Sequence, residues 1–124
     1  MSGPDSQLFL AREVDIQPSC SVKFAFLLKE KKLEGFLIND GGNFRAYINR
    51  CRHMGITLDW DTGEFYNRQK DGLICKTHGA VYRPDTGACT SGPCLGKSLF
   101  PLPLLRESGE VFLDVRKSIE LYSD

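Results

Sequence analysis

The chain has 124 residues and a mass of 13.9 kDa, enough for one domain with a modest core but short of two domains. Apolar residues make up 41% and charged residues 26%, a balance typical of a soluble globular protein. Lys+Arg and Asp+Glu both number 16, so the formal net charge is zero and a strongly basic nucleic-acid-binding surface is not expected.

The amino-terminal residues contain no basic segment followed by a long apolar run, so no secretory signal is predicted. The longest apolar runs, such as residues 24–28 and 111–113, fall far short of the ~20 residues that a spanning helix needs. The five cysteines are too sparse for a disulfide scaffold, and in a reducing compartment cysteines are thiols or metal ligands. The sequence therefore predicts a soluble, cytoplasmic protein without a membrane anchor.

Short β-prone runs separated by turn signals dominate the chain. Residues 1–7 are expected to be disordered, and residues 8–124 are expected to form a single domain. Residues 22–28 and 35–39 are candidate strands. The second runs into a predicted hairpin through Asp40-Gly41-Gly42-Asn43, residue types that tolerate positive φ.

A second hairpin is predicted over residues 104–115, turning at Glu107-Ser108-Gly109-Glu110. Residues 114–121 are the one stretch in which a helix is expected. Between the hairpins, the turn-rich residues 50–98 hold four of the five cysteines and both histidines. The predicted fold class is therefore all-β, with several short antiparallel strands.

Two half-motifs in the turn-rich segment each pair a cysteine with a histidine. The first is Cys51-Arg52-His53, and the second is Cys75-Lys76-Thr77-His78; the 21 residues 54–74 separate them. Gly55 and Gly79 stand close behind, and glycine permits tight turns and close backbone approach. Both half-motifs are therefore predicted to be ligand-bearing loops.

Two thiolates and two imidazoles suit two kinds of centre. One is a single tetrahedral Zn²⁺, which would make the protein an interaction module without a redox role. The other is a [2Fe-2S] cluster with cysteines on one iron and histidines on the other. Zinc sites usually group like ligands, whereas each loop here offers one of each. A binuclear centre explains that arrangement.

These half-motifs resemble the C-x-H…C-x2-H signature of the Rieske [2Fe-2S] family. The resemblance runs over residues 49–99 and includes Gly92-Pro93-Cys94-Leu95-Gly96, which is similar to the family's proline-containing loop over the cluster. It implies an antiparallel β-sandwich with a small cluster-binding subdomain over about residues 49–98. It also implies one [2Fe-2S] cluster for each chain.

The resemblance also implies the ligand assignment. Cys51 and Cys75 would bind the inner iron through sulfur, and His53 and His78 would bind the outer iron through a ring nitrogen. Because neutral imidazoles donate less charge than thiolates, the outer iron is expected to be the one reduced, at a higher potential than in an all-cysteine cluster. No residue is expected to be catalytic.

Departures from the family pattern predict a low potential within the family. Thr77 and Ile56 stand where high-potential members carry the cysteines of an inter-loop disulfide. Ala80 stands where those members carry a serine that hydrogen-bonds a bridging sulfide, whereas Tyr82 matches the tyrosine that bonds a cysteine sulfur. The potential is expected in the lower part of the range of roughly −150 to +300 mV.

Both histidines are assigned to the cluster, so the chain cannot also hold the mononuclear iron site of ring-hydroxylating oxygenases. It also has no G-x-G-x-x-G fingerprint after a strand. The resemblance therefore implies an electron carrier rather than an enzyme: a soluble ferredoxin-type protein between a reductase and a terminal oxygenase. The alternative is a small subunit of a larger oxidoreductase such as nitrite reductase. Redox proteins are the expected partners, with no nucleic acid or small-molecule substrate, and the chain alone is expected to be a monomer.

The remaining cysteines and the inter-loop segment have simpler interpretations. Cys89 and Cys94 are expected to be packing residues rather than a redox disulfide or a second metal site. Cys20 is expected to be a buried thiol. The polar residues 59–72 are expected to form an exposed hairpin or loop, with Trp60 packed against the domain.

Charge is uneven around the predicted loops. From Arg45 to Arg83 there are seven basic and four acidic residues, and seven minus four leaves a local excess of three. Arg52 and Lys76 lie inside the half-motifs. This pattern predicts either an electropositive rim that steers an acidic redox partner or an ordinary solvated surface.

Overall fold

The computed structural model describes residues 7–28, 30–51, 57–59 and 63–121. In these residues the chain forms short strands, one 3-10 turn at Glu13–Asp15 and one helix. The strands are β1 (Gln7–Arg12), β2 (Ser21–Leu28), β3 (Lys31–Asp40), β4 (Asn43–Ile48), β5 (Leu73–Ile74), β6 (Val81–Tyr82), β7 (Cys89–Ser91), β8 (Pro101–Leu102), β9 (Leu104–Glu107) and β10 (Glu110–Asp114). All of the strand pairings are antiparallel, so the predicted all-β fold is confirmed.

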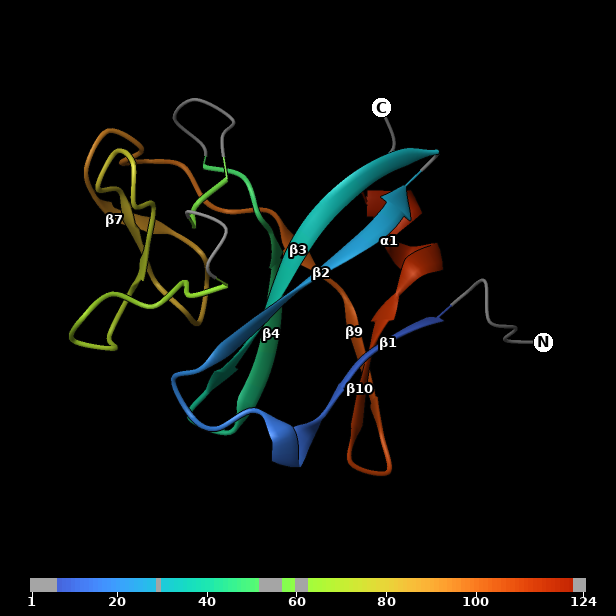
Figure 1. Ribbon diagram of the computed structural model, residues 1–124. Coiled ribbons are helices and arrows are strands. Elements are labelled where there is room, and N and C mark those ends of the chain that lie inside the picture. The colour runs from blue at the N-terminus through green and yellow to red at the C-terminus, as the bar shows by residue number, and fades with distance from the viewer. Residues whose placement is uncertain (1–6, 29, 52–56, 60–62, 122–124) are drawn as a thin grey trace.

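The strands form three sheets, in the orders β1-β10-β9, β2-β3-β4-β8 and β5-β6-β7. In Figure 1 the four-stranded sheet runs through the centre, the sheet of β1, β10 and β9 lies to its right, and the small sheet with β7 lies to its left. The strands β5 to β7 come from the segment that holds the second half-motif. The small sheet therefore stands apart from the two sheets of the sandwich.

The central strand β3 faces two cores at once. Successive side chains of a strand point to opposite faces of the sheet. Phe36 and Ile38 pack among the buried side chains next to the small sheet, whereas Leu37 packs between the two larger sheets. All three side chains are fully buried. A strand covered on both faces needs a continuous apolar run rather than an alternating one, and Phe36-Leu37-Ile38 supplies it.

Both predicted hairpins are confirmed. The β3–β4 hairpin turns through Gly41 and Gly42, with φ of 61° and 96°. The β9–β10 hairpin turns through Ser108 and Gly109, with φ of 53° and 79°. Two-residue hairpin loops favour left-handed backbone, because its twist matches that of the flanking strands. Local turn chemistry therefore fixes both hairpins.

The first and the last strand of the chain, β1 and β10, pair in one sheet of the sandwich. β1 begins at Gln7, which pairs with Asp114 of β10, so the expectation of disorder up to residue 7 was wrong for Gln7; residues 1–6 lie outside the described residues. The expected helix is confirmed as α1 (Val115–Leu121). The Asp114 carboxylate accepts a hydrogen bond from the Lys117 backbone N–H at 3.0 Å, which caps its first turn.

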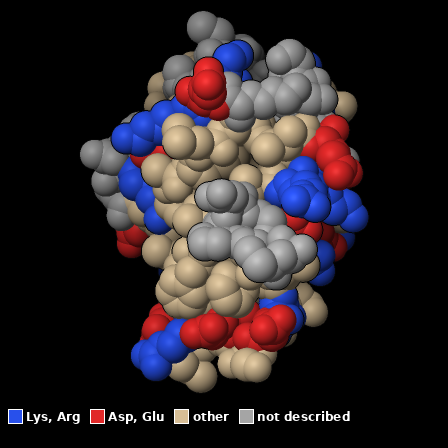
Figure 2. Space-filling view, turned by 90° about the vertical axis from the view of Figure 1, so that its right-hand side faces the viewer, with Lys and Arg blue, Asp and Glu red and all other residues tan. Residues whose placement is uncertain are grey.

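The face opposite the small sheet carries basic and acidic side chains side by side (Figure 2). The ion pairs of the described residues include Arg12 with Asp15 at 3.0 Å and Arg106 with Glu13 at 2.8 Å. Within the described part of the chain, no helix has the length and apolar character needed to cross a membrane.

The expectation of an exposed loop over residues 59–72 is wrong in part. Asp59 and Phe65 are buried, and the Phe65 ring stacks on Phe36 with ring centroids 3.9 Å apart. The end of the segment does form a tight turn, because the Asn67 backbone N–H donates to the Gly72 carbonyl at 2.8 Å. The expected packing of Trp60 lies outside the described residues.

We expect the two-sided core around β3 to dominate stability. Leu37→Ala removes a fully buried side chain and should cost about 2–5 kcal/mol of unfolding free energy. Leu27→Ala, on the neighbouring strand β2, removes a side chain that is 63% exposed and should cost no more than about 0.5 kcal/mol. Urea unfolding followed by circular dichroism measures both. Equal costs for the two variants would contradict this placement of the core.

Candidate metal centre

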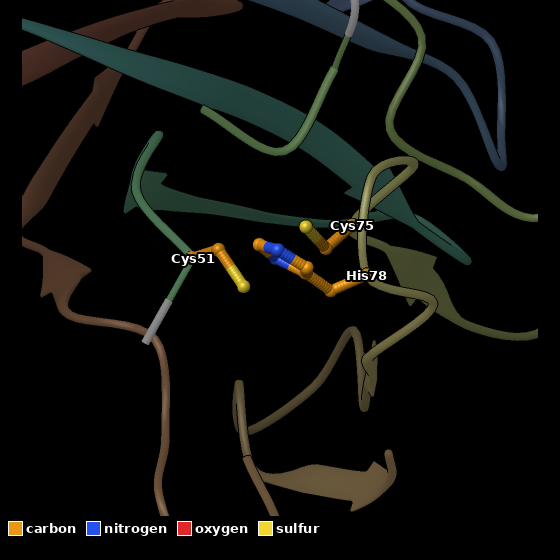
Figure 3. A group of neighbouring side chains, drawn as sticks. All are labelled: Cys51, Cys75 and His78. Carbon is orange, nitrogen blue, oxygen red and sulfur yellow. The ribbon is translucent and has the colours of Figure 1, made fainter. Parts of the chain in front are cut away.

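Two loops carry the half-motifs to one place. Cys51 follows the end of β4, and Cys75 comes directly after β5. Residues 75–80 form a closed turn, in which the Gly79 N–H donates to the Cys75 carbonyl at 2.7 Å and the Cys75 N–H donates to the Ala80 carbonyl at 2.8 Å. Figure 3 shows the side chains of Cys75 and His78 directed from this turn toward Cys51.

Three of the four predicted ligands meet. The Sγ atoms of Cys51 and Cys75 and a ring nitrogen of His78 all lie within 4.8 Å of one another. Both cysteines are fully buried, whereas His78 is half-buried. The Nδ1 atom of His78 is itself buried and makes no hydrogen bond to the described part of the chain. The fourth predicted ligand, His53, lies outside the described residues.

The chemistry of this donor set fits a soft or borderline metal. Thiolate sulfur and imidazole nitrogen are ligands of zinc and of iron–sulfur clusters. Burial raises the pKa of the Cys75 thiol, and hydrogen bonds from the His78 and Thr77 backbone only partly offset that effect. A coordinated metal would reverse this balance, because it deprotonates a thiol ligand outright. The residues present therefore fit a [2Fe-2S] cluster with thiolate and imidazole ligands, as they would fit a zinc ion.

The first loop is closed at its base by the side chain of Asn49. The Oδ1 atom accepts a hydrogen bond from the Leu58 backbone N–H at 2.8 Å, and Nδ2 donates to the Asp59 carboxylate at 3.0 Å. The Leu58 carbonyl in turn accepts a hydrogen bond from the Lys76 backbone N–H at 2.8 Å. One short chain of hydrogen bonds therefore ties the loop of the first half-motif to the loop of the second.

Asp59 anchors this arrangement to the central sheet. Its carboxylate accepts hydrogen bonds from the Gly63 backbone N–H at 2.9 Å and from Nζ of Lys23, on β2, at 3.2 Å. Burial by itself would raise the pKa of Asp59, but the hydrogen bonds from Asn49, Gly63 and Lys23 outweigh it, and the pKa is lowered. The carboxylate therefore stays charged beneath the loops.

Two further groups lie close to the sulfur atom of Cys51. The Tyr82 hydroxyl lies 3.5 Å from Sγ of Cys51, the contact that the family resemblance implied. Sγ of Cys94 lies 3.9 Å from the same sulfur. Sequence reasoning placed Cys94 beside the loops but treated it only as packing. The separation of 43 residues from Cys51 leaves no local signal for this contact.

The other cysteines separate into one confirmed prediction and one wrong one. Cys89 is a buried free thiol, as expected, and its Sγ donates to the Ser91 carbonyl at 3.3 Å. Cys20, expected to be buried, is exposed. Its backbone N–H closes a turn onto the Gln17 carbonyl at 3.1 Å, which places Cys20 at the surface just before β2.

The predicted basic rim is partly neutralised. Nζ of Lys76 lies 3.8 Å from a carboxylate oxygen of Glu64, and the Lys76 side chain is 21% exposed. The other basic residue of the half-motifs, Arg52, lies outside the described residues. The local charge excess in the sequence is therefore not a measure of free positive charge at the loops.

The chain belongs to the Rieske family: the sequence model described as Rieske [2Fe-2S] domain matches residues 10–112. This family holds a [2Fe-2S] cluster, and Cys51, Cys75 and His78 bring two thiol sulfurs and an imidazole nitrogen close together.

The fold is similar to solved structures of known redox proteins. The ferredoxin of carbazole 1,9a-dioxygenase from Nocardioides aromaticivorans IC177 shares 21% identity and a TM-score of 0.65, covering 87% of this chain and 96% of that chain. The terminal oxygenase of carbazole 1,9a-dioxygenase from Novosphingobium sp. KA1 shares 26% identity and a TM-score of 0.68, covering 90% of this chain and 30% of that one. The predicted Rieske-like fold is confirmed.

A curated protein matches part of the sequence. Oxidoreductase NdmD of Pseudomonas putida is 39% identical over 57 residues, which is 44% of this chain. The matched region spans 8% of the length of that relative.

We expect Asp59→Asn to destabilise the fold by about 1–3 kcal/mol at pH 7, because it removes the charge that Lys23 and the loop amides bind. A carboxylate with a lowered folded-state pKa contributes stability above its unfolded pKa of about 3.9 and loses that contribution as the pH falls through its folded value. The difference between wild type and variant should therefore shrink below about pH 4. Urea unfolding followed by circular dichroism from pH 7 to pH 3.5 measures it.

Asp15→Asn is the matched control, since it weakens an exposed ion pair with Arg12, and exposed ion pairs contribute little to stability because water and salt screen them. If Asp59→Asn costs no more than Asp15→Asn, the buried network does not hold the loops.

Proposed function

We propose that Cys51, Cys75, His53 and His78 hold the [2Fe-2S] cluster, with the cysteines on the inner iron and the histidines on the outer iron. The observation that carries the assignment is the meeting of Cys51, Cys75 and His78 from two loops that are distant in sequence. The two fully buried sulfurs and the half-buried imidazole match a cluster with a sulfur side inward and a nitrogen side outward.

We also propose that these ligands belong to a cluster-binding subdomain of about residues 49–98, within a single domain of residues 8–124. The small sheet β5-β6-β7 and its core of side chains around Phe65 and Tyr82 support this division.

We infer that the chain carries single electrons, as a ferredoxin-type protein between a reductase and a terminal oxygenase. A bound [2Fe-2S] cluster supplies the one-electron chemistry. Cys51 and Cys75 keep water from the buried side of the site, and the exposed part of His78 offers the electron a short route to a partner. The chain covers 96% of a ferredoxin of the carbazole dioxygenase system, and another similar structure, 22% identical, is a complex of reduced oxygenase and oxidized ferredoxin in carbazole 1,9a-dioxygenase.

In this proposal the partner enzyme performs the catalytic step. The chain itself has no catalytic residue, binds no small-molecule substrate or nucleic acid, and is a monomer when alone. None of its five cysteines forms a disulfide, which suits a reducing compartment, and we propose the cytoplasm.

The alternative is a small Rieske subunit of a larger oxidoreductase, such as nitrite reductase. The part of the chain that matches Oxidoreductase NdmD is 8% of that protein, and the chain covers 30% of a terminal oxygenase, so similar domains also occur inside larger proteins. Light scattering during gel filtration of the purified chain tests the monomer. Purification at a fixed stoichiometry with a larger oxidoreductase would favour the subunit instead.

We expect Cys75→Ala and His53→Ala to lose the cluster, because each removes a proposed iron ligand. Iron and acid-labile sulfide should fall from roughly two of each per chain to near zero. The visible absorption that dithionite bleaches should disappear with them.

Cys89→Ala, which removes a buried thiol whose hydrogen bond goes to Ser91, should keep the full cluster. A Cys75→Ala protein that keeps a native cluster would refute the ligand assignment. Wild-type protein with one zinc and no acid-labile sulfide would refute electron transfer itself.

We expect the reduction potential of the wild-type protein in the lower part of the Rieske range of roughly −150 to +300 mV. The physical reason is that Ala80 offers no hydroxyl donor to the cluster. Redox titration followed by visible circular dichroism measures the midpoint, and a value near the top of that range would contradict the expectation.

A further inference from the structure

The thiol of Cys94 lies beside a proposed ligand sulfur without being one of the four ligands. Its Sγ is 3.9 Å from Sγ of Cys51, within hydrogen-bonding distance for two sulfur atoms. Cys94 is fully buried. The Tyr82 hydroxyl itself lies 3.5 Å from Sγ of Cys51. The hydroxyl and the two sulfurs therefore form one contact group.

The number of protons in this group decides which atoms donate. As an iron ligand, Cys51 is a thiolate and can only accept hydrogen bonds. Tyr82 and Cys94 each bring one hydrogen that can be donated. Cys94 can donate to the Cys51 sulfur across the 3.9 Å contact, and the Tyr82 hydroxyl can donate to the same sulfur across the 3.5 Å contact. Each of these hydrogens draws negative charge away from the proposed ligand sulfur.

The loop around Cys94 holds the thiol in place. Gly92 has φ of 97°, and a Cβ atom there would lie 2.8 Å from the Cα atom of Ala80, so the loop packs directly on the second ligand loop. The Lys97 N–H donates to the Cys94 carbonyl at 2.9 Å, which closes the turn on the other side. The contact between Cys94 and Cys51 is therefore built into the backbone of residues 92–97.

We propose that Cys94 is a positioning residue that acts with Tyr82 on the ligand sulfur of Cys51 and raises the reduction potential of the centre. The proposal rests on the proposed function, because it takes Cys51 as a ligand. Reduction adds one electron and makes or breaks no bond at Cys94. The added negative charge on the centre strengthens hydrogen bonds to its sulfurs, so each donor favours the reduced state.

The test compares three variants by redox titration and by iron and sulfide content. Cys94→Ala should keep a full cluster and reduce the equilibrium constant for reduction about two- to tenfold, a negative shift of up to about 59 mV for a one-electron couple. Cys94→Ser keeps a donor and should recover at least half of that shift. Cys89→Ala removes a buried thiol from the same segment and should leave the potential unchanged.

A second readout depends on the hydrogen itself. Resonance Raman bands of the Fe–S bonds should shift when wild-type protein is moved from H₂O to D₂O, because donors to the sulfurs exchange. Cys94→Ala should lose part of this isotope shift, and Tyr82→Phe should lose another part. The changes in reduction potential caused by Cys94→Ala and by Tyr82→Phe should be non-additive in the variant that carries both, because the two groups share the Cys51 sulfur as acceptor.

The outcomes separate clearly. Equal potentials for Cys94→Ala and wild type, or equal shifts for Cys94→Ala and Cys89→Ala, would overturn the proposal in favour of packing. Loss of the cluster in both Cys94→Ala and Cys94→Ser would overturn it in favour of a ligand or assembly role. A wild-type protein without iron and sulfide would instead remove the proposed function on which it rests.

Discussion

The structure depends on closing two distant loops around buried sulfur. Cys51 and Cys75 are both fully buried. In the deprotonated form, two buried thiolates carry negative charge, which is energetically costly unless a cation compensates it. Specific hydrogen bonds hold the bases of the two loops. The Asn49 side chain binds the Leu58 backbone, and the Leu58 carbonyl binds the Lys76 backbone N–H. The Asp59 carboxylate binds Lys23 of the central sheet. The metal-binding geometry is therefore a property of the loop bases as much as of the ligands.

The central sheet gives these loops a rigid support. Phe36 and Ile38 face the ligand-bearing side, while Leu37 faces the sandwich, so one strand joins the two cores without a linker. The stacked rings of Phe36 and Phe65 extend this support into the segment between the half-motifs. Movement of the small sheet away from the central sheet would expose both rings to water. Because exposing buried apolar surface is unfavourable, the loops and the sandwich stay packed together.

Much of the fold could be predicted because its signals are local. The hairpins depend on glycine and serine in left-handed backbone, the helix on a capping aspartate, and the ligand pattern on residue spacing. The predictions for Cys20 and for residues 59–72 failed for the opposite reason. Phe65 lies in a mostly polar stretch of the sequence. It is buried because its ring stacks on Phe36, which lies 29 residues earlier in the chain.

The sequence by itself determined the class of centre through its resemblance to the C-x-H…C-x2-H family signature, since two thiols and two imidazoles as proposed ligands would also suit zinc. Only the tertiary structure decided what surrounds those ligands: the buried charge of Asp59, the hydroxyl of Tyr82 and the thiol of Cys94. The proposed ligands follow from their spacing along the chain, whereas the electrostatic environment around them comes from groups that only packing brings near.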